Sequence, residues 1–209
     1  MTAHKLFPSK DKLTAAAVEL LETRVRAVEN DVAICLSGKP PAPFSALLYC
    51  FATVDLLGAF SAGDARTPGR HRGARINTGQ NSRRFMRRFM GYSPAQAILL
   101  QQVYRHKLVH LAQPKLVEYK GRIVGWEVNH GPAPEHLRMI DYLPPREIRV
   151  LSSITYNVER AFTISIRDLV ADIRKSVFDA GRYLDQLASS RRLQKNFARA
   201  LRHIYDPRA

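Results

Sequence analysis

Apolar residues recur at three- and four-residue intervals in the first part of the chain and predict two helices. The first covers Lys12 to Leu36, where one face gathers apolar side chains: Leu13, Ala17, Leu20, Leu21, Val25 and Val28. It ends at the segment Ser37-Gly38-Lys39-Pro40-Pro41, because glycine favours a left-handed cap and proline cannot continue a helix. The second helix, from about Pro43 to Ala62, is apolar almost all round, so we expect it to be the central and most buried one.

The pattern then becomes polar and basic. Gly63 to Asn81 is rich in glycine, arginine, threonine and asparagine, which predicts a mobile basic arm that includes Arg70 and Arg72. A short helix follows from Ser82 to Met90, with phenylalanine and methionine on one face, as is typical of core packing. Its arginines are candidate nucleic-acid contacts: Arg83, Arg84, Arg87 and Arg88. Ser93-Pro94, a capping serine before a first-turn proline, begins another helix that ends before Pro114.

The period changes from helical to alternating after Pro114. Residues 115–119 and 122–128 flank Lys120-Gly121, which predicts a two-residue hairpin. Residues 138–142 and 148–154 are further strand candidates, and the helical pattern resumes from roughly Asn157 and ends in a basic amphipathic helix, Ser190 to Tyr205. We therefore predict a mainly α, single-domain protein, a helical bundle over 1–112 and 157–209 with a small antiparallel sheet inserted at 113–156, α+β overall.

The distribution of charge along the chain indicates which class of partner the protein binds. The chain carries 33 Lys+Arg against 18 Asp+Glu, a net charge of +15, and its 45% hydrophobic content excludes a disordered chain. Residues 63–112 hold ten basic residues and one acidic residue, and residues 181–209 hold seven and two. Such clustering favours a polyanion, with nucleic acid as the leading partner, over a solvated face that serves solubility or an anionic membrane surface.

Several classes of protein find no support in the sequence. The polar start, Met1 to Lys12, lacks a secretory signal, and the apolar run Phe44 to Phe60 carries Asp55, which disfavours a membrane span. Phosphate-binding loops and a Gly-x-Ser-x-Gly elbow are both missing, so we expect no nucleotide cofactor and no serine hydrolase. We predict a soluble, cytoplasmic protein without cofactors.

One short motif suggests chemistry. In Tyr104-Arg105-His106-Lys107-Leu108-Val109-His110, an arginine precedes a histidine by five positions near a helix end. His106 and His110 stand four apart, but a zinc site needs a third ligand and none is near in sequence, so we expect no metal.

This motif resembles that of the HEPN superfamily, Arg, four to six residues, then His, with a polar residue after the Arg. The resemblance covers about residues 44–114, where a buried helix with the lone carboxylate Asp55 precedes the motif helix. It implies a HEPN-like helical bundle and a metal-independent endoribonuclease, often a homodimer. A toxin–antitoxin, phage-defence or stress role would follow, with an antitoxin or a nucleotidyltransferase as a further partner.

The implied roles agree with the chemistry of the residues. RNA carries its own nucleophile, the 2′-hydroxyl, so cleavage needs a proton-transfer group, His110, and fixed positive charge on the phosphorane, Arg105. His106 and Asp55 would orient these two groups. The alternatives are that Arg105 caps carbonyls or pairs with Asp55, and that His110 is a helix-terminal cation or a packed histidine. The alternative function is a non-catalytic nucleic-acid-binding or scaffolding helical protein.

Overall fold

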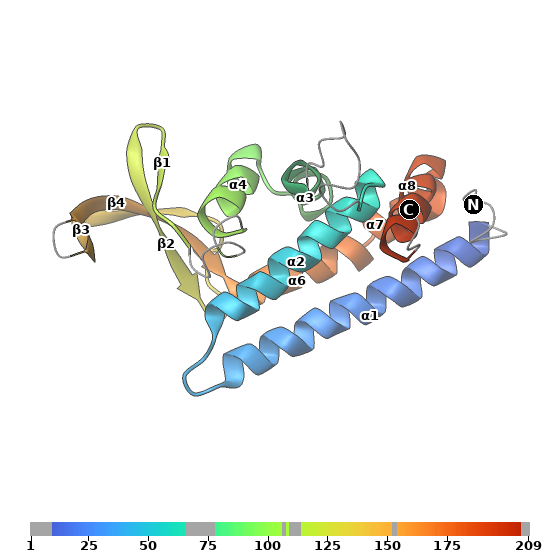
Figure 1. Ribbon diagram of the computed structural model, residues 1–209, viewed down its shortest axis with the longest axis horizontal. Helices are drawn as coiled ribbons and strands as arrows, with labels where there is room; N and C mark the ends of the chain where they lie inside the picture. The colour runs from blue at the N-terminus through green and yellow to red at the C-terminus, as the bar shows by residue number, and fades with distance from the viewer. Residues whose placement is uncertain (1–9, 66–77, 106–107, 109–113, 152–153, 206–209) are drawn as a thin grey trace. The chain divides into compact units, whose positions relative to one another are not determined.

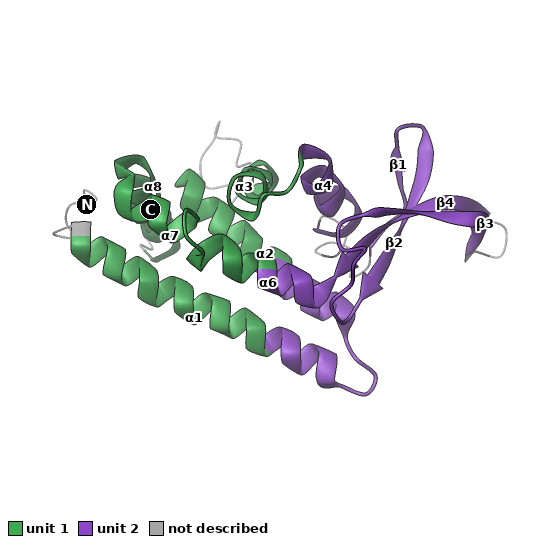
Figure 2. Cartoon of the chain, turned by 180° about the vertical axis from the view of Figure 1, so that it is seen from behind, with its two compact units in different colours: residues 1–30, 51–93, 172–209 green, residues 31–50, 94–171 purple. Residues whose placement is uncertain are grey.

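The computed structural model describes residues 10–65, 78–105, 108, 114–151 and 154–205. The chain divides into two compact units, shown in different colours in Figure 2. Unit 1 comprises Met1–Asn30, Phe51–Ser93 and Asp172–Ala209, and unit 2 comprises Asp31–Cys50 and Pro94–Ala171. Three long helices, labelled in Figure 1, contribute residues to both units: α1 (Lys10–Ser37), α2 (Pro43–Ala62) and α6 (Ile166–Phe178).

The secondary-structure elements of unit 1 are all helical within its described residues. Besides its parts of the long helices it contains α3 (Thr78–Phe85), the π-helical segment η2 (Met86–Met90), α7 (Tyr183–Ser189) and α8 (Arg191–Tyr205). Aromatic rings join these helices: Phe60 of α2 meets Phe197 of α8 at 4.8 Å, and Tyr183 of α7 meets Phe89 at 5.1 Å. The expected core positions of Phe85, Met86 and Phe89 are confirmed because all three are buried, whereas Met90 is half-buried.

A glycine lets α3 lie directly against α2. A Cβ atom at Gly58 would stand 2.8 Å from the backbone nitrogen of Ser82 and 2.9 Å from the carbonyl carbon of Asn81. Only a residue without a side chain permits this approach. The first residues of α3, Thr78–Asn81, were expected to belong to the basic arm, of which residues 66–77 lie outside the described residues.

Unit 2 combines helix with a four-stranded sheet. Its helical part includes α4 (Pro94–Leu99) and the π-helical segment η3 (Leu100–Arg105). The strands are β1 (Val117–Tyr119), β2 (Arg122–Asn129), β3 (Met139–Leu151) and β4 (Ile154–Ser165), in the order β1-β2-β4-β3. The hairpin at Lys120-Gly121 is confirmed, since both residues have positive φ, 53° and 72°, and β1 pairs antiparallel with β2.

The sheet corrects the predicted fold class. A small antiparallel insertion in a HEPN-like bundle was expected, but β2 and β4 pair in parallel, so the sheet is mixed and the fold is α+β. The two strand candidates 138–142 and 148–154 fall largely within one strand of 13 residues, β3, which is irregular between Asp141 and Arg146. The HEPN-like bundle is therefore wrong as a description of this fold.

The helix expected from Asn157 is also wrong over its first part, because β4 continues to Ser165. β4 lies between β2 and β3, and its last five residues, Ala161–Ser165, are all buried. Two of these residues are polar, and their hydroxyls bond backbone carbonyls: Thr163 donates to Arg138 at 3.0 Å and Ser165 to Gly131 at 2.8 Å. Because both faces of the strand are buried, a single apolar face does not mark it as a strand in the sequence. The helix α6 begins at Ile166, where the Ser165 hydroxyl accepts the Asp168 amide at 3.1 Å and so caps it.

The apolar helix α2 is confirmed with the predicted bounds. By length and composition alone it could span a membrane, but half of its most apolar window is buried within the described structure. Leu48 and Tyr49 are exposed, at 41% and 46%, so α2 is less completely buried than expected. This burial is typical of a core helix in a soluble protein.

Candidate nucleic-acid interface

Two helical segments of unit 1 carry basic residues and no carboxylate. The first runs Thr-Gly-Gln-Asn-Ser-Arg-Arg-Phe-Met-Arg-Arg-Phe-Met through α3 and η2. The second is α8, Arg-Arg-Leu-Gln-Lys-Asn-Phe-Ala-Arg-Ala-Leu-Arg-His-Ile-Tyr. We call them the basic helices. Without Asp or Glu at i±3 or i±4, neither segment can neutralise its own cations through side-chain pairs.

On α3 and η2, burial of the apolar side chains decides which arginines face solvent. Phe85, Met86 and Phe89 fill the core, which leaves Arg84 and Arg87 exposed. Among the described residues, neither has a hydrogen-bond or ion-pair partner. Arg83 is half-buried.

Arg88 differs from its neighbours. Its Nη2 donates to Gln186 Oε1 at 2.6 Å, and its guanidinium lies 4.9 Å from the centre of the Phe89 ring. Arg88 thus attaches η2 to α7, so it has a structural role beside any contact with a ligand.

On α8 the same separation of faces recurs. Leu193, Phe197 and Leu201 are buried, while Arg191, Arg192 and Lys195 are exposed. These three cations have no hydrogen-bond or ion-pair partner within the described part of the chain. Arg88 and Arg199 are exposed too but have partners, so the exposed cations of the basic helices without a described partner are Arg84, Arg87, Arg191, Arg192 and Lys195.

Other polar residues of α8 close the end of α2. Asn196 Nδ2 donates to the Ser61 carbonyl at 2.7 Å, and Arg199 Nε donates to the Gly63 carbonyl at 2.7 Å. Ala65 belongs to the expected basic arm and is the last residue described before its undescribed part, and its backbone amide donates to His203 Nδ1 at 3.3 Å. α8 therefore caps α2 with one set of side chains and presents cations with another.

The excess charge belongs mainly to unit 1. Its described residues hold sixteen Lys and Arg against nine Asp and Glu, whereas those of unit 2 hold ten against eight. The predicted concentration of positive charge therefore falls on the helical unit. The sheet unit is close to neutral.

Both segments that the sequence singled out contain a π-helical turn. η2 holds Arg87 and Arg88, and η3 ends at Arg105. A π turn inserts one extra residue into a helix and rotates the side chains that follow, and such turns are frequent at functional sites. The two π turns therefore mark the same two segments as the sequence did, on grounds other than charge.

The Arg105 motif is only partly described. Arg105 is the half-buried last residue of η3, and His106 and His110 lie outside the described residues, as do Arg70 and Arg72. Tyr104, directly before Arg105, is fully buried, and its hydroxyl bonds the carbonyls of Phe162 at 2.6 Å and Glu127 at 2.9 Å. Burial raises the pKa of Tyr104 well above its ordinary value, so this anchor stays protonated.

Asp55 has a partner within its own unit. The Ser82 hydroxyl of α3 donates to its carboxylate. Arg105 belongs to unit 2, so the predicted interaction of Asp55 with Arg105 stays a prediction.

Unit 2 contains a groove that the sequence analysis did not predict. It has a volume of about 1000 Å³ and is lined from the start of α2, the segment before β1, and all four strands. The lining includes aromatic rings, Trp126, Tyr142 and Tyr156, and the cations Lys115, Arg146 and Arg149. Because these residues come from separate strands, only the strand pairing brings them together.

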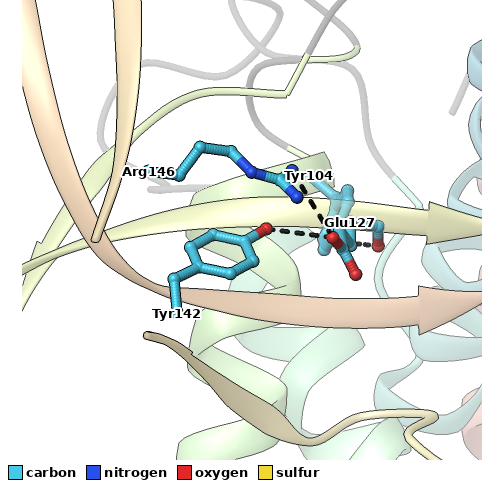
Figure 3. Close-up of polar contacts among 4 residues, drawn as sticks. All are labelled: Tyr104, Glu127, Tyr142 and Arg146. Carbon is cyan, nitrogen blue, oxygen red and sulfur yellow. Dashed lines mark hydrogen bonds and ion pairs between the residues drawn. The ribbon is translucent and has the colours of Figure 1, made fainter. Parts of the chain in front are cut away.

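A polar cluster occupies one wall of the groove (Figure 3). Tyr142 Oη donates to Glu127 Oε1 at 3.0 Å, and Arg146 Nη1 lies 3.7 Å from the same oxygen. The Arg146 guanidinium also lies 4.4 Å from the centre of the Tyr142 ring. Burial and the Glu127 carboxylate raise the pKa of Tyr142 to about 12. The cluster therefore satisfies Glu127 with one neutral donor and one cation.

No group of three or more metal-ligating side chains occurs in the described part of the chain. No family model, curated protein or solved structure matches the chain. Function therefore has to be argued from the residues and surfaces described above.

Proposed function

We propose that this protein binds RNA through the exposed cations of its basic helices. The observation that carries the proposal is that five such cations have no partner among the described residues, on helices that contain no carboxylate. A chain that needed charge only for solubility could intersperse both signs, as unit 2 does. Unopposed guanidinium and ammonium groups match a ligand with regularly spaced phosphates.

Binding of this kind has a characteristic dependence on salt. Each cation that contacts a phosphate releases a counterion, and for a single strand the logarithm of affinity falls by about 0.7 per contact for each unit of log salt. We therefore expect steep salt dependence for the intact protein, measured by fluorescence anisotropy with a labelled single-stranded RNA between roughly 50 and 200 mM salt.

A pair of charge-matched variants tests the surface. The test variant replaces with glutamine the five exposed cations of the basic helices that have no described partner: Arg84, Arg87, Arg191, Arg192 and Lys195. The control replaces five exposed basic residues of unit 2 with glutamine: Lys39, Lys120, Arg122, Arg138 and Arg167. Both variants lose the same net charge, so a difference between their RNA affinities does not come from net charge.

We expect the test variant to flatten the salt dependence by up to about 3.5 in slope, and the control to retain most of it. Equal losses in the two variants would show that affinity depends on net charge alone and would refute the proposed surface.

A second candidate function is metal-independent RNA cleavage by Arg105 and His110. It is favoured by the Tyr104 hydroxyl, whose proton is shared between two backbone carbonyls of the sheet, which fixes the helical segment next to Arg105. Transition-state stabilisation requires a charge held in place before reaction, and the anchored backbone next to Arg105 restricts where its guanidinium can lie. His110 would transfer the proton of the attacking 2′-hydroxyl or of the leaving oxygen.

Cleavage is tested with purified protein, labelled RNA and EDTA, by looking for 2′,3′-cyclic phosphate ends. Arg105→Ala and His110→Ala should each abolish cleavage while RNA affinity stays nearly intact, and His106→Ala should lose less. Gln102→Ala, at an exposed position of η3, is the control. Cleavage that survives His110→Ala would leave the protein with the binding function only.

A further inference from the structure

We propose that the groove of unit 2 binds one nucleotide of an unpaired strand, with its base against the aromatic side chains and its phosphate near Lys115 and Arg149. This inference rests on the proposed RNA binding and deepens it by assigning a site for the base. The groove lies wholly in unit 2, whereas the basic helices lie wholly in unit 1, so separate variants can test the two sites.

The aromatic side chains supply surfaces for a base. Trp126 is half-buried and held edge-on against Phe44, with ring centres 5.5 Å apart, whereas Tyr156 is 40% exposed. One ring is therefore fixed and the other accessible. Stacking on aromatic rings accepts every base, because each base has a π face.

The charges in the groove favour an anionic ligand. Three cations and two carboxylates line it, but Glu127 is already bound by Tyr142 and Arg146. Lys115 and Arg149 are exposed, and neither has a partner among the described residues. A ring system that carries a phosphate satisfies both the aromatic rings and these two cations, whereas a neutral ring or a bare phosphate satisfies only one of them.

The chain provides its own probe of this site. Trp126 is its single tryptophan and lines the groove, so the intrinsic fluorescence reports on groove occupancy. The intact protein would be titrated with adenosine monophosphate, with adenosine, with inorganic phosphate and with a short single-stranded oligoribonucleotide. We expect the monophosphate to quench Trp126 more strongly than adenosine at equal concentration, and phosphate to leave the emission unchanged.

Three groove variants and one control sharpen the test. Tyr156→Ala should weaken binding of the monophosphate roughly 5- to 100-fold, the range for loss of one stacked base. Lys115→Gln and Arg149→Gln should weaken the monophosphate but leave adenosine unchanged. Lys120→Gln, in the turn of the same sheet and outside the groove, should change neither.

The source of the nucleotide is decided by comparing the ligands. Tighter binding of the oligoribonucleotide than of the monophosphate supports a strand, and the reverse order would overturn that part of the inference in favour of a free nucleotide. Absence of Trp126 quenching by any nucleotide up to millimolar concentration would overturn the site. A failure of the RNA-binding proposal for the basic helices can be distinguished from a failure of the groove proposal. The variant of unit 1 that lacks the five cations should still bind the monophosphate in the groove.

Discussion

The two units use arginine in different ways. In unit 2, three arginines lie beside carboxylates of another strand of the sheet: Arg160 Nε is 2.5 Å from Asp141, Arg122 is 3.5 Å from Glu159, and Arg146 is 3.7 Å from Glu127. In unit 1, Arg84 and Arg191 have no partner in the described structure, and Arg199 binds carbonyl oxygens at the end of α2.

Strand pairing explains part of this difference. Arg160 and Asp141 are direct partners in the register of β3 and β4, and opposite charges across a strand pair stabilise a sheet modestly. The basic helices contain no carboxylate, so their exposed cations can gain nothing comparable from their own helix. Unit 1 also contains an ion pair, since Arg174 Nη1 lies 3.0 Å from Glu29 Oε1. The comparison therefore teaches that the three paired arginines of the sheet contribute to folding, whereas the basic helices retain charges that folding does not require.

The largest effect that we predict contrasts two tightly packed glycines, Gly58 and Gly125. Gly58→Ala should destabilise the protein by about 2–3 kcal/mol, because the new Cβ meets the backbone of Asn81 and Ser82, which cannot move aside. Gly125→Ala should cost about 1 kcal/mol or less, because its closest obstacle, at 3.0 Å, is the side chain of Val158. Thermal or urea unfolding measures both. Equal losses would mean that the backbone contact of α3 with α2 is not rigid.

A smaller effect separates paired from unpaired arginines. Asp141 and Arg160 are 57% and 37% exposed, so we expect a coupling of about 0.2–1 kcal/mol in a double-mutant cycle of Arg160→Gln and Asp141→Asn. Arg87→Gln, at an exposed site without a partner, should change the free energy of unfolding by less than about 0.5 kcal/mol. A larger loss from Arg87→Gln would assign that residue to folding and remove it from the proposed interface.

The smallest effect concerns pH. Tyr142 has a pKa of about 12 in the folded protein against 10 for an ordinary tyrosine, so the folded state retains a proton that the unfolded chain loses first. Its contribution to stability is complete below about pH 10 and is lost as the pH rises towards 12. A spectrophotometric titration that compares the protein with its Tyr142→Phe variant should show one tyrosine removed from the late-ionising group. Loss of an ordinary tyrosine near pH 10 would contradict the cluster with Glu127.

Most helices and the hairpin could be predicted from the sequence because local signals suffice for them. The two prolines after Gly38 end α1 within one residue of the predicted position, and Lys120-Gly121 specifies its turn by positive φ. The basic amphipathic helix α8 could also be predicted from local sequence, because its apolar and charged residues alternate with a helical period.

The remaining features depend on contacts between distant segments. Phe162 of β4 stands four residues before Ile166, so it continues the helical spacing of the apolar face of α6 back into the strand. The π turns shift hydrogen bonds by one residue without changing composition, and the groove arises only when residues near 43, 115, 126, 142 and 156 meet. For the same reason, the Arg105 motif indicated candidate residues but not the sheet on which Tyr104 anchors them.

Because α8 both caps α2 and presents cations, ligand binding to α8 also affects how fast the protein is degraded. Because Asn196 and Arg199 hold the last carbonyls of α2, α8 cannot detach without exposing the end of that helix. A polyanion that binds only the assembled α8 therefore opposes local unfolding by mass action. Proteases act on opened chains, so the loaded protein would be degraded more slowly than the empty one, and its abundance would follow that of its ligand.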